Sequence, residues 1–175
     1  MTQKKMTQKN DKNKKMTHDE RALRQQVLDL LAGGGAHAGF DDAISGLPAK
    51  LRGRKPRGLP HTAWMLVEHM RIAQRDILEF SRNPNYVCPH WPDDYWPPQQ
   101  APPSPAAWAA SIQKFRQDLK TMQALVKNPK TDLFAKLSWG EGQTILREAL
   151  LVADHNAYHL AQLVDLRRLL GAWPG

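Results

Sequence analysis

The segment Asp154-His155-Asn156-Ala157-Tyr158-His159 guides the interpretation of the whole chain, because it places two histidines four residues apart in a helix-forming stretch. That spacing puts both imidazoles on one helix face, one turn apart, as two ligands of a single metal ion require. We therefore expect an inward-facing helix over about residues 143–170. Its inward stripe is polar at the centre and comprises Thr144, Glu148, Leu151, His155, His159, Gln162 and Leu166.

A second polar interruption occurs on an earlier amphipathic stretch, residues 60–82, which contains no proline or glycine after its first residue. Pro60 can begin a helix there, because proline is tolerated in the first turn. If this helix neighbours the C-terminal one, His69 joins His155 and His159, and three imidazoles converge near the middle of the fold. The stripe that carries it reads Thr62, Leu66, His69, Ala73, Asp76 and Phe80.

Other segments complete a helical pattern. Thr17 and Glu20 form a capping-box signature before apolar residues at helical spacing over 18–32. A shorter helix follows, and residues 104–127 give another long amphipathic helix. No segment alternates between apolar and polar residues with a period of two. The chain is therefore expected to be all-α: a four-helix bundle with a long crossover connection.

The expected crossover is residues 83–103, which hold seven of the chain's thirteen prolines and so exclude regular structure. A connection of this length in a small domain is typical of a crossover or of a cover over a site. Its aromatic residues Trp91, Tyr95 and Trp96 can seal the connection against the helices or form the wall of a pocket. At the far end of the C-terminal helix, Arg167 and Arg168 suit the negative helix terminus.

The positive charge is concentrated in two places. The chain has 175 residues and a formal net charge of +8. The positive charge of residues 1–15 and of the loop around residues 50–57 together exceeds this net value, so the remaining residues are slightly acidic. We expect residues 1–16 to be a disordered basic tail and residues 17–175 to form one helical bundle domain. Because the expected helices carry no basic stripe, a nucleic-acid partner is unlikely on composition. The translation start at Met1, Met6 or Met16 stays open.

Cellular location is expected from two observations. The longest apolar runs are far shorter than a bilayer requires, and no apolar stretch resembles a secretion signal, so no membrane association is expected. The single cysteine, Cys88, can form no internal disulfide and no cysteine-based zinc site. The cytoplasm is the default expectation.

Three histidines with water in a fourth position make an open site, as in catalytic zinc centres, and nickel also suits imidazole ligands. The competing interpretation is that the pair lies on an exposed face, or that each buried histidine bonds a neighbouring carbonyl. His69, on a separate stripe, raises the weight of the metal hypothesis.

Three segments resemble the DinB-like superfamily, which includes YfiT-like proteins described as metal-dependent hydrolases. They are Leu59–His69, Ala73–Phe80 and, above all, Asp154–Val164, with its spaced histidine pair and downstream glutamine. The resemblance extends over about residues 18–173 and implies a four-helix bundle with a long crossover. It also implies a divalent ion held by His69, His155 and His159, and the three imidazoles favour zinc or nickel. One departure is Ala161, where many members carry glycine.

Two carboxylates are candidate catalytic residues. Asp76 lies one heptad after His69 and could orient a ligand histidine or act as a base; pairing with an arginine or capping a loop is the alternative. Glu148 lies two turns before His155 and could act as an acid, a base or a fourth ligand; a solvated helix face is the alternative.

Several other residues have weaker claims. Gln162 and Tyr158 could hydrogen-bond the ligand histidines or serve only packing. His61 is expected to be a cap or loop contact, with lining of the site mouth as the alternative. Cys88-Pro89-His90 is an improbable nucleophile and base, because the proline-rich setting orients neither group.

Three functional hypotheses follow. In the first, the metal ion supports hydrolysis, or S-transfer with a low-molecular-weight thiol as a small-molecule substrate, as the resemblance implies for some relatives. In the second, the chain is a metal-stabilised stress-response or interaction protein without turnover, which a fourth protein ligand or burial under residues 83–103 would indicate. A nucleic-acid partner acting through the basic tail is a third and weaker hypothesis. The resemblance also makes a homodimer plausible.

Overall fold

The computed structural model describes residues 16–174, and this part of the chain is helical. Within it there are no strands, and only Lys136 and Thr144 form an isolated β-bridge. The all-α prediction is confirmed. The expected disordered tail lies outside the described residues, except for Met16. The elements, in chain order, are α1 (His18–Ala32), α2 (Phe40–Ile44), η1 (Ala49–Leu51), α3 (Ala63–Arg82), η2 (Asp93–Tyr95), α4 (Pro105–Lys127) and α5 (Ile145–Leu169).

Each of the four long helices begins at a serine or threonine whose hydroxyl accepts a backbone N–H of the first turn. The predicted capping box is present, with Thr17 and Glu20 bonding each other's backbone. The expectation that Pro60 begins a helix is wrong. Thr62 caps α3 instead, accepting from the backbone N–H of Met65 at 3.2 Å, and its hydroxyl donates to the carbonyl of Gln100 at 2.6 Å.

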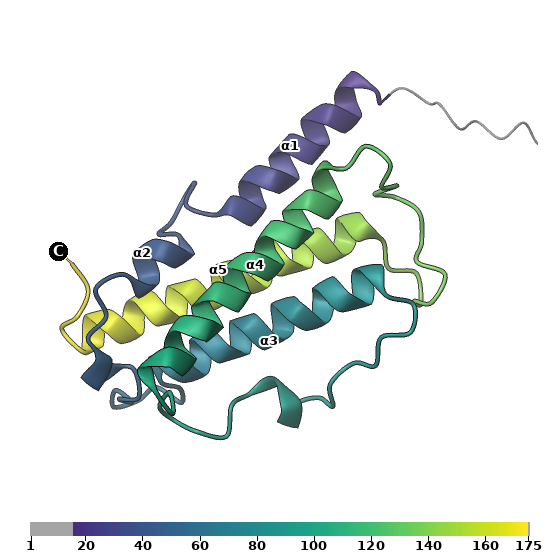
Figure 1. Cartoon of the computed structure of the whole chain (residues 1–175). Coiled ribbons are helices and arrows are strands. Elements are labelled where there is room, and N and C mark those ends of the chain that lie inside the picture. Colours follow the sequence, from purple (N-terminus) through teal and green to yellow (C-terminus); the bar gives the residue numbers. More distant parts are fainter. Residues whose placement is uncertain (1–15, 175) are drawn as a thin grey trace, which may run out of the picture.

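The long helices lie side by side, as Figure 1 shows. α3 packs against both α4 and α5, and α1 packs against α4 and α5 from the other side. α3 and α4 run in the same direction, so the chain between them must return along the length of α3. Residues 83–104 do this and form the expected crossover, with the short helix η2 near its middle.

The core follows the contact between α3 and its neighbours. A large cluster joins the N-terminal half of α3 to α2, to the first half of α4 and to the second half of α5. Within it the rings of Phe40 and Phe115 stack with centroids 3.9 Å apart. A second cluster, which includes Val27, Leu78 and Val152, joins the opposite ends of these helices to α1. The site described below lies between the two clusters, where the core turns polar.

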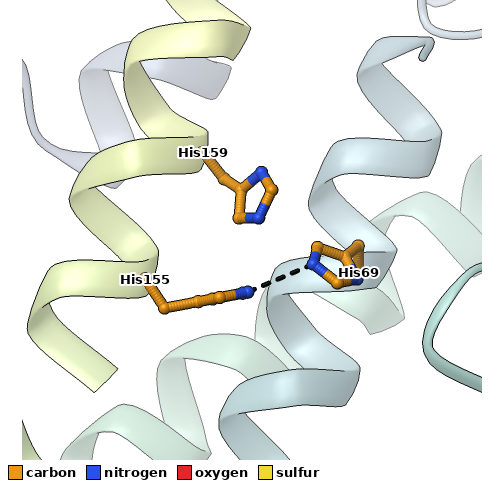
Figure 2. Close-up of side chains that lie close together, drawn as sticks. All are labelled: His69, His155 and His159. Carbon is orange, nitrogen blue, oxygen red and sulfur yellow. Dashed lines mark hydrogen bonds between the residues drawn. The ribbon is translucent and has the colours of Figure 1, made fainter. Parts of the chain in front are cut away.

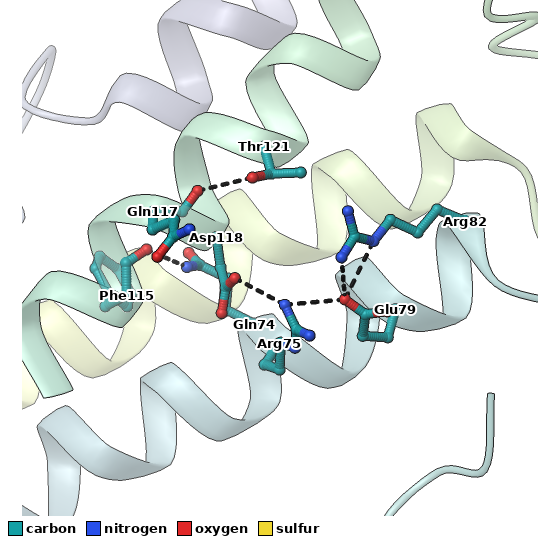
Figure 3. Close-up of polar contacts among 8 residues, drawn as sticks. All are labelled: Gln74, Arg75, Glu79, Arg82, Phe115, Gln117, Asp118 and Thr121. Carbon is teal, nitrogen blue, oxygen red and sulfur yellow. Dashed lines mark hydrogen bonds and ion pairs between the residues drawn. The ribbon is translucent and has the colours of Figure 1, made fainter. Parts of the chain in front are cut away.

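Polar contacts between α3 and α4 run beside this core (Figure 3). Gln74, which is fully buried, donates through Nε2 to the backbone carbonyl of Phe115 at 2.7 Å. The next residue of α3, Arg75, bridges Asp118 at 3.1 Å and Glu79 at 2.9 Å. Arg82 adds a contact to Glu79 at 2.5 Å. These contacts fix how α3 is placed against α4.

Two buried arginines link chain segments that are far apart in sequence. Arg24 of α1 donates to the carbonyls of Val126, Asn128 and Thr131 at the end of α4. Arg167 lies in the last turn of α5, as expected, but it is buried there, with 1% of the residue exposed. It donates to carbonyls of α2 and of the C-terminal segment. None of the described helices is both long and apolar enough to cross a bilayer.

Candidate metal centre

Adjacent antiparallel helices bring the three predicted histidines together. His69 comes from the middle of α3, and His155 and His159 come from successive turns of α5 (Figure 2). The Nε2 atoms of His69 and His155 are 3.1 Å apart. One nitrogen from each of the three rings lies within 4.8 Å of the others. Among the described residues, this is the group of His, Cys, Asp and Glu side chains that could hold a metal ion.

Hydrogen bonds at Nδ1 set the orientation of two of these rings. The Nδ1 of His69 lies 2.8 Å from the backbone carbonyl of Tyr95, in the crossover. The Nδ1 of His159 lies 2.8 Å from Oε1 of Gln162, one turn farther along α5. A carbonyl oxygen can only accept, so both Nδ1 atoms carry the proton and both Nε2 atoms present a lone pair. This is the arrangement in which a second group fixes the tautomer of a metal-ligating histidine.

The surroundings keep the imidazoles neutral. Burial lowers the pKa of His69 to about 4, and the nearby His159 adds to this effect. Burial also lowers the pKa of His155 to about 4, with His159 and His69 contributing, while the side chain of Asn156 opposes the shift. The pKa of His159 is lowered by burial as well. Neutral imidazole is the form that binds a metal ion, so the site is ready for one at neutral pH.

The nitrogen lone pairs of the three imidazoles indicate whether a metal ion fits between them. A single proton on Nε2 of His155 can be donated to His69 but leaves the lone pair of His159 without a partner. A divalent ion would engage all three. Nitrogens bound tetrahedrally to one ion lie about 3.3 Å apart, and the pair at 3.1 Å already approaches this value. The nitrogen of the third ring lies within 4.8 Å of the other two, so the three residues fit a metal ion once this ring moves closer.

Aromatic rings of the crossover and of the segment before α3 cover one side of the site. Trp96 stacks on His69 with centroids 3.9 Å apart and an angle of 2° between the planes. His61 stacks on Trp96, also at 3.9 Å, and the rings lie 10° from parallel. Burial lowers the pKa of His61, and the nearby His159 contributes. His61 therefore lines the edge of the site, which is the alternative role that its position in the sequence left open.

The two candidate catalytic carboxylates lie outside the histidine cluster. Asp76 accepts from the hydroxyl of Tyr95 at 2.7 Å, and the backbone of that same residue bonds His69. Asp76 thus reaches the cluster only through Tyr95. Glu148 is 2% exposed and pairs with Arg147 at 2.7 Å. Since the described part of the chain brings no carboxylate to the three nitrogens, Glu148 is not a fourth ligand here.

Of the remaining candidates, Gln162 and Tyr158 contact the site, whereas His90 and Cys88 lie away from it. Gln162 makes the hydrogen bond to His159 described above. Tyr158 packs edge-on against His159 with ring centroids 4.9 Å apart, although 63% of it is exposed. His90 is 3.8 Å from Asp93 rather than paired with Cys88. Burial and the carboxylate of Asp76 raise the pKa of the Cys88 thiol, so the expected weakness of this nucleophile is supported.

Two contacts escaped sequence reasoning. The carbonyl of Tyr95 that holds His69 is a backbone group, and backbone groups leave no residue-type signal. The stacking of Trp96 on His69 depends on how the crossover folds back. The only available signal was compositional, namely the tryptophans and tyrosines concentrated among the prolines of residues 83–103.

Comparison with protein families agrees with this site. The family model described as the DinB superfamily matches residues 35–163, which is most of the chain and includes His69, His155 and His159. The match begins after α1, so it is shorter than the stretch over which the sequence itself shows a resemblance. No curated protein and no solved structure shows significant similarity to the chain. The family match and the helical fold together establish that the chain belongs to the DinB superfamily.

Proposed function

We propose that this protein binds a divalent metal ion through Nε2 of His69, His155 and His159 and uses it for hydrolysis or thiol transfer. The observation that carries the proposal is the convergence of three neutral imidazoles whose ligating nitrogens lie within 4.8 Å of one another. Two of them already have Nδ1 bound to an oxygen, which leaves Nε2 for the ion.

Zinc or nickel is the ion that we propose. Three imidazoles form a donor set that suits zinc and nickel, whereas magnesium and calcium prefer oxygen ligands. No cysteine or carboxylate in the described part of the chain adds a harder or softer donor to the group. Three protein ligands also leave a tetrahedral ion one position for an exogenous ligand, which is the arrangement of catalytic zinc sites.

A divalent ion held in this way supplies Lewis acidity, lowering the pKa of a bound water or thiol and polarising an electrophile. The chain's own groups fix and shield the ligands. Tyr95 and Gln162 hold two of the imidazoles in the required tautomer, and Trp96 keeps water from one face of His69. The carboxylate of Asp76 holds the Tyr95 hydroxyl and so steadies the crossover where it bonds His69.

A thiol used in the reaction must come from the substrate. The chain's single cysteine is Cys88, and burial together with Asp76 raises the pKa of its thiol. Since the thiolate is the reactive form, this cysteine is a poor nucleophile at neutral pH. We therefore propose a low-molecular-weight thiol as the co-substrate if the reaction is a transfer.

A second candidate function is a metal-stabilised protein without turnover, and one observation favours it. His69 and His159 are 3% and 7% exposed, and five cavities among the described residues, including one beside Trp96, are lined by none of the three histidines. The half-buried His155 gives the cluster its most exposed edge. A substrate would have to approach from that side.

Metal analysis of the purified protein tests the proposal. Wild type should contain one equivalent of zinc or nickel, and His69→Ala and His155→Ala should each lose it. His90→Ala is the matched control, because His90 lies in the crossover but away from the cluster, beside Asp93. Full metal content in either cluster variant would contradict the proposed ligand set. If the metal-loaded wild type turns over neither thiol nor hydrolysable substrates, the non-catalytic candidate is favoured.

A further inference from the structure

Two neighbouring residues at the site carry buried polar atoms that make no hydrogen bond among the described residues. They are Nδ1 of His155 and Oδ1 of Asn156. Asn156 is 8% exposed and follows the ligand histidine directly on α5. Buried polar atoms without partners are rare in native proteins, so two adjacent ones call for an explanation.

The tautomer of His155 supplies the explanation. Nε2 of His155 lies 3.1 Å from Nε2 of His69, and His69 carries its own proton on Nδ1, facing Tyr95. His155 must then be the donor in this pair, which leaves its Nδ1 as an acceptor. An acceptor nitrogen and the acceptor oxygen of Asn156 cannot bond each other, so both atoms stay unpaired.

A metal ion bound to Nε2 of His155 would remove this mismatch between two acceptors. A neutral imidazole that ligates through Nε2 carries its proton on Nδ1, and a buried N–H without an acceptor is costly. The other two ligand histidines already have such acceptors in Tyr95 and Gln162. For His155, Oδ1 of the next residue, Asn156, is a buried acceptor with no other partner among the described residues, and the side chain of Asn156 is close enough to His155 to raise its pKa.

A chain of amides fixes which atom Asn156 presents. The carbonyl of Phe115 can only accept, so the Gln74 atom 2.7 Å away is its NH2 group (Figure 3). Oε1 of Gln74 therefore faces Asn156, and the atom of Asn156 that meets it at 2.9 Å is Nδ2, the donor. This leaves Oδ1 as the atom of the Asn156 side chain that is free to accept. Gln74 is 1% exposed, so water does not compete for these bonds.

We propose that Asn156, oriented by Gln74 and the Phe115 carbonyl, accepts the Nδ1 proton of His155 when the metal ion is bound. Gln74 and Asn156 are thus positioning residues of the metal centre, although neither contacts the ion. The inference rests on the proposed metal binding. It adds to the site a series of hydrogen bonds that runs from α5 through α3 to α4. It also gives each of the three ligand histidines its own oxygen acceptor.

Zinc affinity measured by competition with a chelator tests the role of both residues. Asn156→Leu should weaken zinc binding by about 10- to 100-fold, the usual effect of losing a group that orients a ligand. Asn156→Asp keeps an acceptor for Nδ1 of His155 but loses the donor that Oε1 of Gln74 faces, so it should recover only part of that loss. Gln74→Leu should weaken binding less, and should cost nothing further when added to Asn156→Leu. Ser81→Ala is the control, because this buried serine of α3 bonds only its own helix, at Ile77.

Nuclear magnetic resonance of the wild-type protein gives a readout that a purely structural role would not change. In the zinc-bound protein, His155 should show a proton on Nδ1 that exchanges slowly with solvent. Ligation through Nε2 by itself places a proton on Nδ1, so the slow exchange is the part of this readout that depends on Asn156, and it also decides the matter if Asn156→Leu does not fold. A zinc-bound His155 whose Nδ1 proton exchanges rapidly, or Asn156→Leu binding zinc within about twofold of wild type, overturns the inference while leaving the three-histidine centre intact. Absence of zinc binding by wild type overturns both.

Discussion

Replacing Arg167 by methionine should destabilise the protein strongly, although it lies at the end of α5. Its guanidinium is 1% exposed and bonds three carbonyls. Nη1 donates to Ala43 at 2.7 Å and to Asp42 at 3.1 Å, at the end of α2. Nε and Nη2 donate to Ala172 at 3.0 and 2.7 Å. Methionine has similar length but no donor, so these carbonyls would lose their partner.

The size of the effect follows from these contacts. Leaving a buried acceptor unsatisfied costs about 1–3 kcal/mol. The Ala43 bond is fully buried, whereas the other carbonyls are partly exposed and can recover some hydration from water. We therefore expect the free energy of unfolding to fall by about 3–4 kcal/mol. For a domain of this size, that corresponds to a decrease in Tm of about 6–16 °C.

Urea and thermal unfolding of the purified variants measure this effect. The control is Arg168→Met, because the Arg168 side chain is 61% exposed and pairs with the exposed Asp165. We expect it to change the free energy of unfolding by less than about 0.5 kcal/mol. Arg167→Lys should lie between the two, since lysine keeps the charge but cannot reach several carbonyls. If Arg167→Met were no less stable than Arg168→Met, the assignment of Arg167 as the link between α5 and α2 would be refuted.

Three further predictions concern the site and the other end of the bundle. Zinc at 100 times its Kd should stabilise wild type by about 2.7 kcal/mol but not His155→Ala, as measured by thermal unfolding; equal stabilisation of both would contradict the site. Without metal, stability should fall as the pH drops from about 6.5 toward 4, because burial lowers the pKa of His69 and His155 to about 4 and the unfolded chain then binds more protons. Urea unfolding at several pH values checks this, and His69→Ala should show a weaker dependence. Arg24→Met should lower the free energy of unfolding by about 2–4 kcal/mol, because Arg24 bonds three carbonyls near the end of α4, whereas the exposed Arg21 should tolerate the same change.

The helices were predictable because each carries its own local signals. Apolar spacing located all four long helices, and hydroxyl residues and prolines set their limits to within a few residues. The one wrong start shows how such signals compete. Proline suits the first turn of a helix, but Thr62 offers a hydroxyl that accepts from Met65, and this cap places the start at Ala63.

The histidine cluster was predictable for a different reason. His155 and His159 share a helix face by spacing alone, and His69 interrupts an otherwise apolar stripe. Their meeting required only that α3 and α5 be neighbours, which the amphipathic patterns favoured. The roles of Asp76 and Glu148 could not be settled in this way. Each lies two helical turns from its histidine, and whether a carboxylate reaches a site depends on partners such as Tyr95 and Arg147.

Buried cations were the largest failure of sequence reasoning. Arg167 and Arg168 are adjacent and chemically identical, and both suit the negative end of a helix. Their positions differ by 100° around α5, and only the first faces α2. The carbonyls that it bonds there lie 124 and 125 residues earlier in the chain. Periodicity cannot anticipate such a partner, because a backbone carbonyl is present at every residue.

The crossover is best regarded as part of the candidate metal centre. The carbonyl of Tyr95 holds one ligand ring through its Nδ1, and Trp96 covers the face of that ring. The bond from Thr62 to Gln100 then ties the end of the crossover to the start of α3. Any opening of residues 83–104 would therefore release the orientation of His69 as well as uncover it. Entry of a substrate past the half-buried His155 would leave these contacts intact, so this edge, rather than the crossover, is where the proposed ion would be reached.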